Sequence, residues 1–309
     1  MSHSFSLGTL DLCHLRPGIG PSEALRATLG LAPLVESFGY SRYWVAEHHN
    51  PHVAHSAPEM LLPILAERTR TLRVGTAGVL LSLYSPFKVA SVFRLLSEIY
   101  PGRIDLGVGR HPANPVIQNL MMGDSTRIPY AEKVKELSRF LRGEGEPPAQ
   151  PVTAPTPEVW ILGAQSTSME LAAENGSALC MSLFLQQEAA VDVRSVLEQY
   201  RERFQPSPEL AVPKCAIAFA GVCAETEQEA RRLAAQRLPI INPSVVGTPE
   251  QCREQIEEMR ERYGTDEFVV LDLGHTFEER VRSHELLAEV LELEVPWRPR
   301  RDLIYHLPA

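Results

Sequence analysis

The sequence predicts one closed (β/α)8 barrel, and three observations support this fold class. Eight short, apolar, β-rich runs occur along the 309 residues, and helical patterns separate nearly all of them. Several runs are apolar on both faces, as strands buried in a parallel sheet must be. A doubly wound sheet would need a Gly-rich turn after its first strand, and residues 13–18 (CHLRPG) do not form that pattern.

The expected elements follow from these patterns in chain order. The strands cover residues 5–12, 43–46, 73–81, 103–108, 159–162, 178–183, 214–222 and 268–273. The helices cover residues 22–38, 58–67, 86–100, 128–141, 167–175, 188–204, 225–237 and 278–293, and another begins after residue 248. Two helix starts carry a capping box, with Ser or Thr followed three residues later by Glu or Gln: Ser56 with Glu59, and Thr248 with Gln251.

Residues 143–157 (GEGEPPAQPVTAPTP) interrupt this alternation. The stretch is rich in Pro, Gly and Glu, so it is not expected to form a regular element. It lies between two halves of a barrel that needs both, which favours a surface excursion over a domain boundary. We therefore expect residues 1–309 to form a single barrel domain.

Composition excludes several classes of function. Hydrophobic residues make up 44% of the chain and charged residues 22%, which is typical of a soluble globular protein. The net charge of −9 argues against nucleic acid or an anionic membrane as the main partner. Five scattered cysteines without a C-x-x-C pair favour buried thiols in a reducing compartment. With no signal-peptide pattern and no apolar run of membrane-spanning length, a cytoplasmic protein is expected.

The strand 43–46 ends at Glu47, His48 and His49. Titratable groups at the carboxyl end of a buried strand occupy the place where α/β proteins keep their chemistry. With His52 and His55, the two histidines could be metal ligands, an acid/base site, or polar loop residues. No carboxylate stands in a recognised ligand pattern with them, which argues against a metal site, but all three alternatives stay open until the resemblance described below favours a flavin site without a metal.

Three further segments are candidates for binding a ligand. Small residues in the second half of strand 73–81, including Thr76, Ala77 and Gly78, indicate either tight packing or the approach of a flat ligand. Arg110 follows the strand 103–108 and suits a phosphate or carboxylate, although an isolated surface Arg is the alternative.

The third candidate segment opens the helix 167–175. Gln165, Ser166, Thr167 and Ser168 combine hydroxyls with free backbone N–H groups and suit an anion, although Ser and Thr are also routine caps. Because these residues and Arg110 leave consecutive strands, they can share one phosphate.

Together these segments resemble the bacterial luciferase-like monooxygenase family of flavin-dependent barrels. The resemblance rests on WVAEHH, VGTAGVLL, PFKVA through PGRIDLGVGR, ILGAQSTSMELAA and VVGTPEQ, which occur in the family's order. It implies that FMN binds at the carboxyl face, with its ring against the third-strand backbone at Thr76, Ala77 and Gly78. In that family the ring often lies at a non-proline cis peptide bond, and the bond that matches it in this chain is Ala77–Gly78.

The resemblance also implies roles for the polar residues. The residues expected to bind the FMN phosphate are Arg110, Gln165, Ser166, Thr167 and Ser168. His48 matches the catalytic imidazole, and Glu47 and His49 are expected to support it, because neighbouring strand side chains point to opposite sides. Light emission is not expected, since Gly109 replaces a reactive Cys of the luciferases and residues 224–246 are too short for their lid.

The implied activity is that of a two-component monooxygenase. Reduced FMN from a separate flavin reductase would react with O2 to form a C4a-peroxyflavin that oxidises a small organic substrate. No nicotinamide-binding fingerprint is present, which agrees with a separate reductase. Two alternatives remain: an F420-dependent hydride-transfer oxidoreductase, and a non-catalytic flavin-binding protein.

The helices after the second and third strands carry more apolar surface than a barrel wall requires, and the family dimerises there. A homodimer is therefore expected. The apolar residues concerned are Met60, Leu61, Leu62, Ile64, Leu65, Val89, Val92, Phe93, Leu95 and Leu96.

Overall fold

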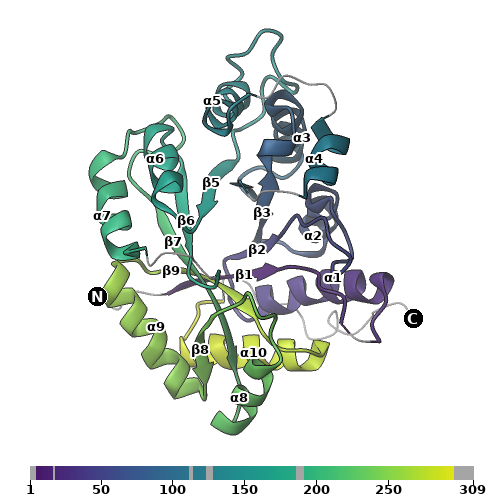
Figure 1. The fold of residues 1–309 in the computed structure, drawn as a ribbon, viewed down its shortest axis with the longest axis vertical. Helices are drawn as coiled ribbons and strands as arrows, with labels where there is room; N and C mark the ends of the chain where they lie inside the picture. The colour runs from purple at the N-terminus through teal and green to yellow at the C-terminus, as the bar shows by residue number, and fades with distance from the viewer. Residues whose placement is uncertain (1–4, 17, 111–113, 123–127, 186–190, 296–309) are drawn as a thin grey trace.

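The computed structural model describes residues 5–16, 18–110, 114–122, 128–185 and 191–295. Parallel strands occupy the centre, and helices surround them as an outer layer (Figure 1). The strands are β1 (Ser6–Asp11), β2 (Arg42–Val45), β3 (Arg73–Leu80), β4 (Ile104–Gly109), β5 (Glu158–Gly163), β6 (Ala178–Ser182), β7 (Cys215–Cys223), β8 (Pro243–Gly247) and β9 (Glu267–Asp272). The helices are α1 (Pro21–Ser37), α2 (Leu62–Arg68), α3 (Pro86–Ile99), α4 (Pro115–Met122), α5 (Tyr130–Leu141), α6 (Ser166–Glu174), α7 (Val193–Arg203), α8 (Glu227–Ala235), α9 (Pro249–Tyr263) and α10 (Phe277–Val290), with short 3-10 turns η1 (Pro58–Met60) and η2 (Leu81–Leu83).

Eight of the strands close into a parallel ring. β1 pairs with β2 on one edge and with β9 on the other, and the order runs from β2 through β6 to β7, which pairs with β9. Every residue of β2 and of β7 is buried, as expected for strands covered on both faces. The predicted (β/α)8 barrel is confirmed, and each predicted strand agrees with its ring strand to within one residue at either end.

A ninth strand was not predicted. β8 pairs with Ala220–Cys223, the carboxyl half of β7, while β6 pairs with the amino half. Its sequence is PSVVG, with a Pro and a Gly at its ends, so it lacks an ordinary strand pattern. β8 therefore extends the sheet beside β7, and the ring closes without it.

Helix starts show one correct and one wrong prediction. Thr248 and Gln251 form the predicted capping box at the start of α9. The predicted box of Ser56 with Glu59 is wrong, because the residue directly before the first turn is Ala57, which has no side-chain acceptor. Pro58 then starts the single turn η1, and α2 follows as a separate helix.

Two other helical segments differ from expectation. α4, with the sequence PVIQNLMM, was not predicted. The predicted helix 188–204 begins at Val193, and its residues 188–190 lie outside the described residues.

The amino end of the barrel interior holds a buried charge network. Arg42 donates to Asp105 at 2.6 Å and to Glu158 at 3.3 Å, and also bonds Glu267. Its guanidinium lies over the Trp160 ring, 4.9 Å from the centroid. Burial alone would lower the pKa of Arg42, but the three carboxylates raise it above its usual range. The network therefore keeps its charges paired inside the barrel.

The irregular segment 143–157 contains no helix or strand. Arg94 on α3 is buried and fastens this segment. Its Nε donates to the Pro151 carbonyl at 2.8 Å, and its terminal nitrogens bond the Leu141 and Val152 carbonyls. Arg94 thus holds the loop by donating to backbone carbonyls that would otherwise need water as a hydrogen-bond donor.

The ten apolar residues expected on a dimer face divide between core and surface. Leu61, Leu62, Leu65, Val89, Phe93 and Leu96 are buried in the core, and Val92 is partly buried. Only Met60, Ile64 and Leu95 of that set are exposed. Most of the apolar excess is therefore explained by packing within one chain.

Candidate active site at the carboxyl face of the barrel

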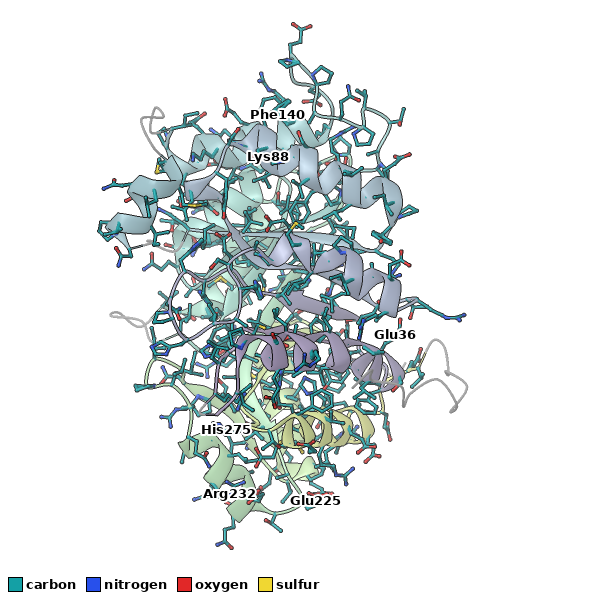
Figure 2. The ribbon with its side chains drawn as sticks, turned by 90° about the vertical axis from the view of Figure 1, so that its right-hand side faces the viewer. Glu36, Lys88, Phe140, Glu225, Arg232 and His275 are labelled. Atoms are coloured by element: carbon teal, nitrogen blue, oxygen red, sulfur yellow. The ribbon has the colours of Figure 1, made fainter. Side chains whose placement is uncertain are left out.

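Four neighbouring strands carry the candidate site residues at their carboxyl ends. β2 pairs with β3, β3 with β4, and β4 with β5. The segments around His48, Ala77, Arg110 and Gln165 therefore leave adjacent strands on one face. Two residues labelled in Figure 2 mark the two ends of the barrel. His275 follows β9 and marks the carboxyl face, and Glu36, which accepts the amides just before β3, marks the amino face.

Glu47 is a hydrogen-bonding centre of the site. The carboxylate is buried, and its Oε1 accepts the Tyr84 hydroxyl at 2.7 Å. Its Oε2 accepts the backbone N–H of Leu80 at 2.9 Å. Burial and the Glu47 carboxylate raise the pKa of Tyr84 well above its usual range, so this phenol remains a donor. These bonds connect the segment after β2 to the turn after β3.

His49 is held by the same carboxylate. Its Nε2 lies 2.6 Å from Glu47 Oε1, so the ring must carry a proton on Nε2 to donate there. His48 and His49 are both half-buried. Because β2 ends at Val45, strict strand alternation does not extend to the two histidines, and the expected geometric reason for their unequal roles does not apply. The hydrogen bond to Glu47 fixes the position of the His49 ring.

The Ala77–Gly78 peptide bond is cis, as the resemblance implied. The hydroxyl of Thr76 donates to the Gly107 carbonyl of β4 at 3.0 Å and is buried, so this side chain serves the sheet. A Cβ on Gly78 would lie 2.8 Å from the Gly107 carbonyl oxygen. Tight packing of β3 on β4 therefore accounts for this glycine, while Ala77 remains partly exposed.

The predicted phosphate-binding residues lie at the ends of β4 and β5. Arg110, Gln165, Ser166 and Thr167 are exposed, and Ser168 is half-buried. Gln165 is the N-cap of α6, and its side chain makes no capping hydrogen bond. The Ser168 N–H donates to the Gln165 carbonyl at 3.2 Å, but no side chain caps the start of α6. The positive end of the helix dipole therefore suits an anion there.

Tyr130 belongs to this end of the site and was not predicted. Its hydroxyl is buried and has no hydrogen-bond partner among the described residues. Burial raises its pKa, and the charge of Arg110 acts in the opposite direction. A phosphate bound by Arg110 would give the hydroxyl an acceptor. A tyrosine in the first turn of a helix carries no sequence signal for this role.

The described residues contain neither a metal-binding cluster nor a membrane-spanning helix. Within them, no group of three His, Cys, Asp or Glu side chains is placed to hold a metal ion, and no helix is long and apolar enough to cross a membrane. All five cysteines are free and buried. A cavity of about 400 Å³ lined by Arg73, Arg142 and Glu158 opens near the starts of β3 and β5, at the barrel end opposite the candidate site.

Comparisons with known proteins agree with this fold. Bacillus subtilis (strain 168) YwcH is 33% identical over 92% of this chain and 98% of its own length. The N-acetyl-S-alkylcysteine monooxygenase of the same organism is 33% identical over 83% of this chain and 81% of its own.

Two solved structures are similar in fold. The crystal structure of apo-MsnO8 has a TM-score of 0.84 and 32% identity, and covers 94% of this chain and 99% of that chain. The oxygenating constituent of 3,6-diketocamphane monooxygenase, in complex with FMN, has a TM-score of 0.74 at 19% identity. The match covers 94% of this chain and 98% of that chain. At this identity the similarity supports the fold and carries no conclusion about function.

The fold and the polar residues at its carboxyl face define a (β/α)8 barrel of the kind that carries its site at the strand ends. The model of the family described as luciferase-like monooxygenase matches residues 5–243. The chain belongs to this family of monooxygenases, and the predicted resemblance is confirmed.

Proposed function

We propose that this protein is an FMN-dependent monooxygenase that takes reduced FMN from a separate flavin reductase, uses O2, and oxidises a small organic substrate. The observation that carries the proposal is that several hydrogen-bond donors follow the carboxyl ends of the neighbouring strands β4 and β5. Arg110, the partnerless hydroxyl of Tyr130 and the uncapped start of α6 together suit a phosphate.

Each residue has a defined task in this proposal. Arg110, Tyr130 and the segment from Gln165 to Ser168 hold the phosphate. Ala77, Gly78 and the backbone of Thr76 lie against the flavin ring. Reduced flavin, when bound, supplies the electron pair that activates O2. The protein's part is to bind, orient and exclude water.

His48 is the proposed proton donor or acceptor. An imidazole suits this task near neutral pH. Glu47 holds His49 at 2.6 Å and ties it to Tyr84, which supports the loop that carries His48. His48 then acts on the reacting groups, and His49 fixes the loop.

A quaternary arrangement also belongs to the proposal. Met60, Ile64, Leu95 and Ile99 are exposed at 68%, 42%, 52% and 55%, and come from η1, α2 and α3. We infer that this apolar surface joins two copies of the chain.

The test uses reduced FMN and O2 with the whole chain. Protein in excess over reduced FMN should slow the appearance of H2O2 relative to free reduced FMN, because a bound flavin is shielded from water. Serum albumin at the same concentration is the control. Oxidation at the rate of free reduced FMN would reject the proposal, and tight binding of F420 with no binding of FMN would favour the hydride-transfer alternative.

A further inference from the structure

The turn η2, which follows β3, is hydrogen-bonded from two sides. On one side is Lys133 of α5, whose side chain is buried. Its Nζ donates to the carbonyls of Ser82 and Tyr84 at 2.8 Å each, and to the carbonyl of Leu81 at 3.4 Å. An ammonium group has three N–H donors and no acceptor, so three carbonyls match it. Lys133 therefore serves the backbone of this turn.

Burial makes these bonds important for the charge of Lys133. It lowers the pKa of the amine, while the charge of Glu136 acts in the opposite direction. Among the described residues, no carboxylate lies within 4.0 Å of the amine. A buried charged group needs other partners to replace the hydrogen bonds of water. Here the carbonyls of the short stretch 81–84 replace them, so the ammonium group and the turn fix each other's positions.

Glu47 bonds the other side of the same turn. Its Oε2 accepts the Leu80 N–H at 2.9 Å, and its Oε1 accepts the Tyr84 hydroxyl at 2.7 Å. Tyr84 is shared between the two sides, because its carbonyl accepts from Lys133 and its hydroxyl donates to Glu47. The turn is thus held between a cation on α5 and a carboxylate that follows β2.

The same path reaches the two histidines. Glu47 Oε1 lies 2.6 Å from His49 Nε2, and Glu47 directly precedes His48. Three hydrogen bonds of 2.8, 2.7 and 2.6 Å therefore connect Lys133 to His49. At the other end of the path, Lys133 and Tyr130 share one side of α5, because they are spaced by about one helical turn.

We propose that Lys133 is a positioning residue: it fixes the turn η2 and, through Tyr84 and Glu47, the loop that carries the two histidines. This inference rests on the proposed function, in which His48 moves a proton at this face. Lys133 acts only through the residues it bonds. Without its ammonium group the three carbonyls lose their donor, the turn loosens, and Glu47 holds the imidazole less firmly.

Arg94 on α3 provides a matched control. It is also a buried cation on a helix, and it donates to three backbone carbonyls between residues 141 and 152. Those carbonyls precede the start of β5, at the barrel end opposite the candidate site. Lys133→Met and Arg94→Met therefore remove the same kind of contact at different places. Both should lower the midpoint of denaturant unfolding.

Two amides report on the histidine loop, which we define as residues 46–54. The Ala46 N–H donates to the Asp11 carbonyl at 3.1 Å, and the Ala54 N–H donates to the Cys13 carbonyl at 3.0 Å. Loosening of the loop breaks these bonds more often, so both amides then exchange with deuterium faster.

Hydrogen exchange of the whole chain, without flavin or substrate, tests the proposal. Lys133→Met should raise exchange about tenfold both in the turn η2 and in the histidine loop, the scale of a lost charge-assisted hydrogen bond. Arg94→Met should raise exchange in residues 143–157 and leave the histidine loop as in wild type. Unchanged exchange of the histidine loop in Lys133→Met, or an equal rise in Arg94→Met, overturns the proposal.

A double-mutant cycle tests whether Lys133 acts through Tyr84. Tyr84→Phe removes only the hydroxyl that Glu47 accepts, and should also raise exchange of the histidine loop. The effects of Tyr84→Phe and Lys133→Met should not add, because either change breaks the same path. Additive effects would mean that Lys133 acts by another route, and would reject the positioning role. Lys133→Gln, which keeps an N–H donor without the charge, takes the place of Lys133→Met if that variant does not fold.

Reduced FMN separates this inference from the proposed function. With reduced FMN and O2, Lys133→Met should release H2O2 faster than wild type, as His48→Ala should, whereas Arg94→Met should release it as wild type does. If wild type does not slow H2O2 release, the proposed function fails, and hydrogen exchange still decides the role of Lys133. If wild type slows it and Lys133→Met leaves the histidine loop unchanged, only the positioning role is rejected.

Discussion

Arg42 on β2 and Asp105 on β4 form an ion pair at 2.6 Å in the interior of the barrel, across the intervening strand β3. Gly75 on β3 lies next to Asp105, and a Cβ at this position would lie only 2.5 Å from the Asp105 Cβ. Trp44 also donates to the same Asp105 oxygen at 2.9 Å. Although burial would raise the pKa of Asp105, Arg42 and Arg73 keep it lowered, so the carboxylate is ionised.

Removing Arg42 should destabilise the fold strongly. Arg42→Ala leaves Asp105 buried without its main counter-ion, and breaking a buried pair in this way costs about 3–5 kcal/mol of the free energy of unfolding. Urea denaturation measures the change, and Asp105→Asn provides a second variant if Arg42→Ala does not fold. Arg231→Ala, which breaks an exposed pair on α8, should leave stability unchanged. Equal effects of Arg42→Ala and Arg231→Ala would contradict this account.

FMN affinity should depend on both Arg110 and Tyr130. Arg110→Ala should weaken binding by roughly ten- to hundredfold, since a charge-assisted contact is worth about 1.5–3 kcal/mol. Tyr130→Phe should weaken it about fivefold, as expected for one neutral hydrogen bond. Flavin fluorescence titration measures both affinities, with Arg139→Ala on the exposed face of α5 as the control. Unchanged affinity in Arg110→Ala would remove this residue from the site.

His48 and His49 should respond differently to substitution. His48→Ala should keep FMN affinity, lower product formation by ~10²–10⁴-fold, the usual scale for a lost acid/base group, and raise the yield of H2O2. His49→Ala should have a smaller effect, because it loosens the Glu47 contact and removes no proton carrier. Product and peroxide are measured together after mixing reduced FMN, enzyme and O2. Full coupling in His48→Ala with loss in His49→Ala would reverse the two roles.

Stability should fall as the pH drops below about 6.5. His14, His55, His275 and His284 all have lowered pKa values, with burial as the main cause, so the unfolded chain takes up protons that the folded chain refuses. Each can contribute at most ~1.4 kcal/mol per pH unit.

His284 should account for part of this slope. It is fully buried, and its Nδ1 bonds the Arg280 carbonyl at 2.7 Å. The free energy of unfolding, measured at pH 7.5, 6.5 and 5.5, should depend less steeply on pH in His284→Gln than in wild type. A profile for wild type that is flat over this range would contradict the buried neutral histidines.

The exposed apolar surface of α2 and α3 should join two copies of the chain. Ile64→Glu with Leu95→Glu places charges on this surface and should shift a wild-type dimer to monomer in light scattering at micromolar concentration. Leu120→Glu alters an equally apolar, 75% exposed side chain on α4 and should leave the dimer intact. Monomeric wild type would rule out the dimer.

The sequence by itself determined the barrel and the positions of its site segments. Strand ends were predicted within one residue because apolar runs and their flanking turns are local features, and the order of strands follows from the right-handed β-α repeat. The same order put Arg110 and Gln165 on adjacent strands before any contact was known. The Thr248 cap was readable for the same reason, because all of its bonds lie within four residues.

The tertiary structure alone decided which partners these residues have. Glu47 meets Leu80 and Tyr84 across 33 and 37 residues, and no local pattern marks that meeting. β8 is a strand only because the carboxyl half of β7 offers it an edge. Burial similarly leaves the Tyr130 hydroxyl without a hydrogen-bond partner among the described residues. Hydrogen bonding and desolvation depend on distances between segments remote in sequence, whereas periodicity reports only on neighbours along the chain.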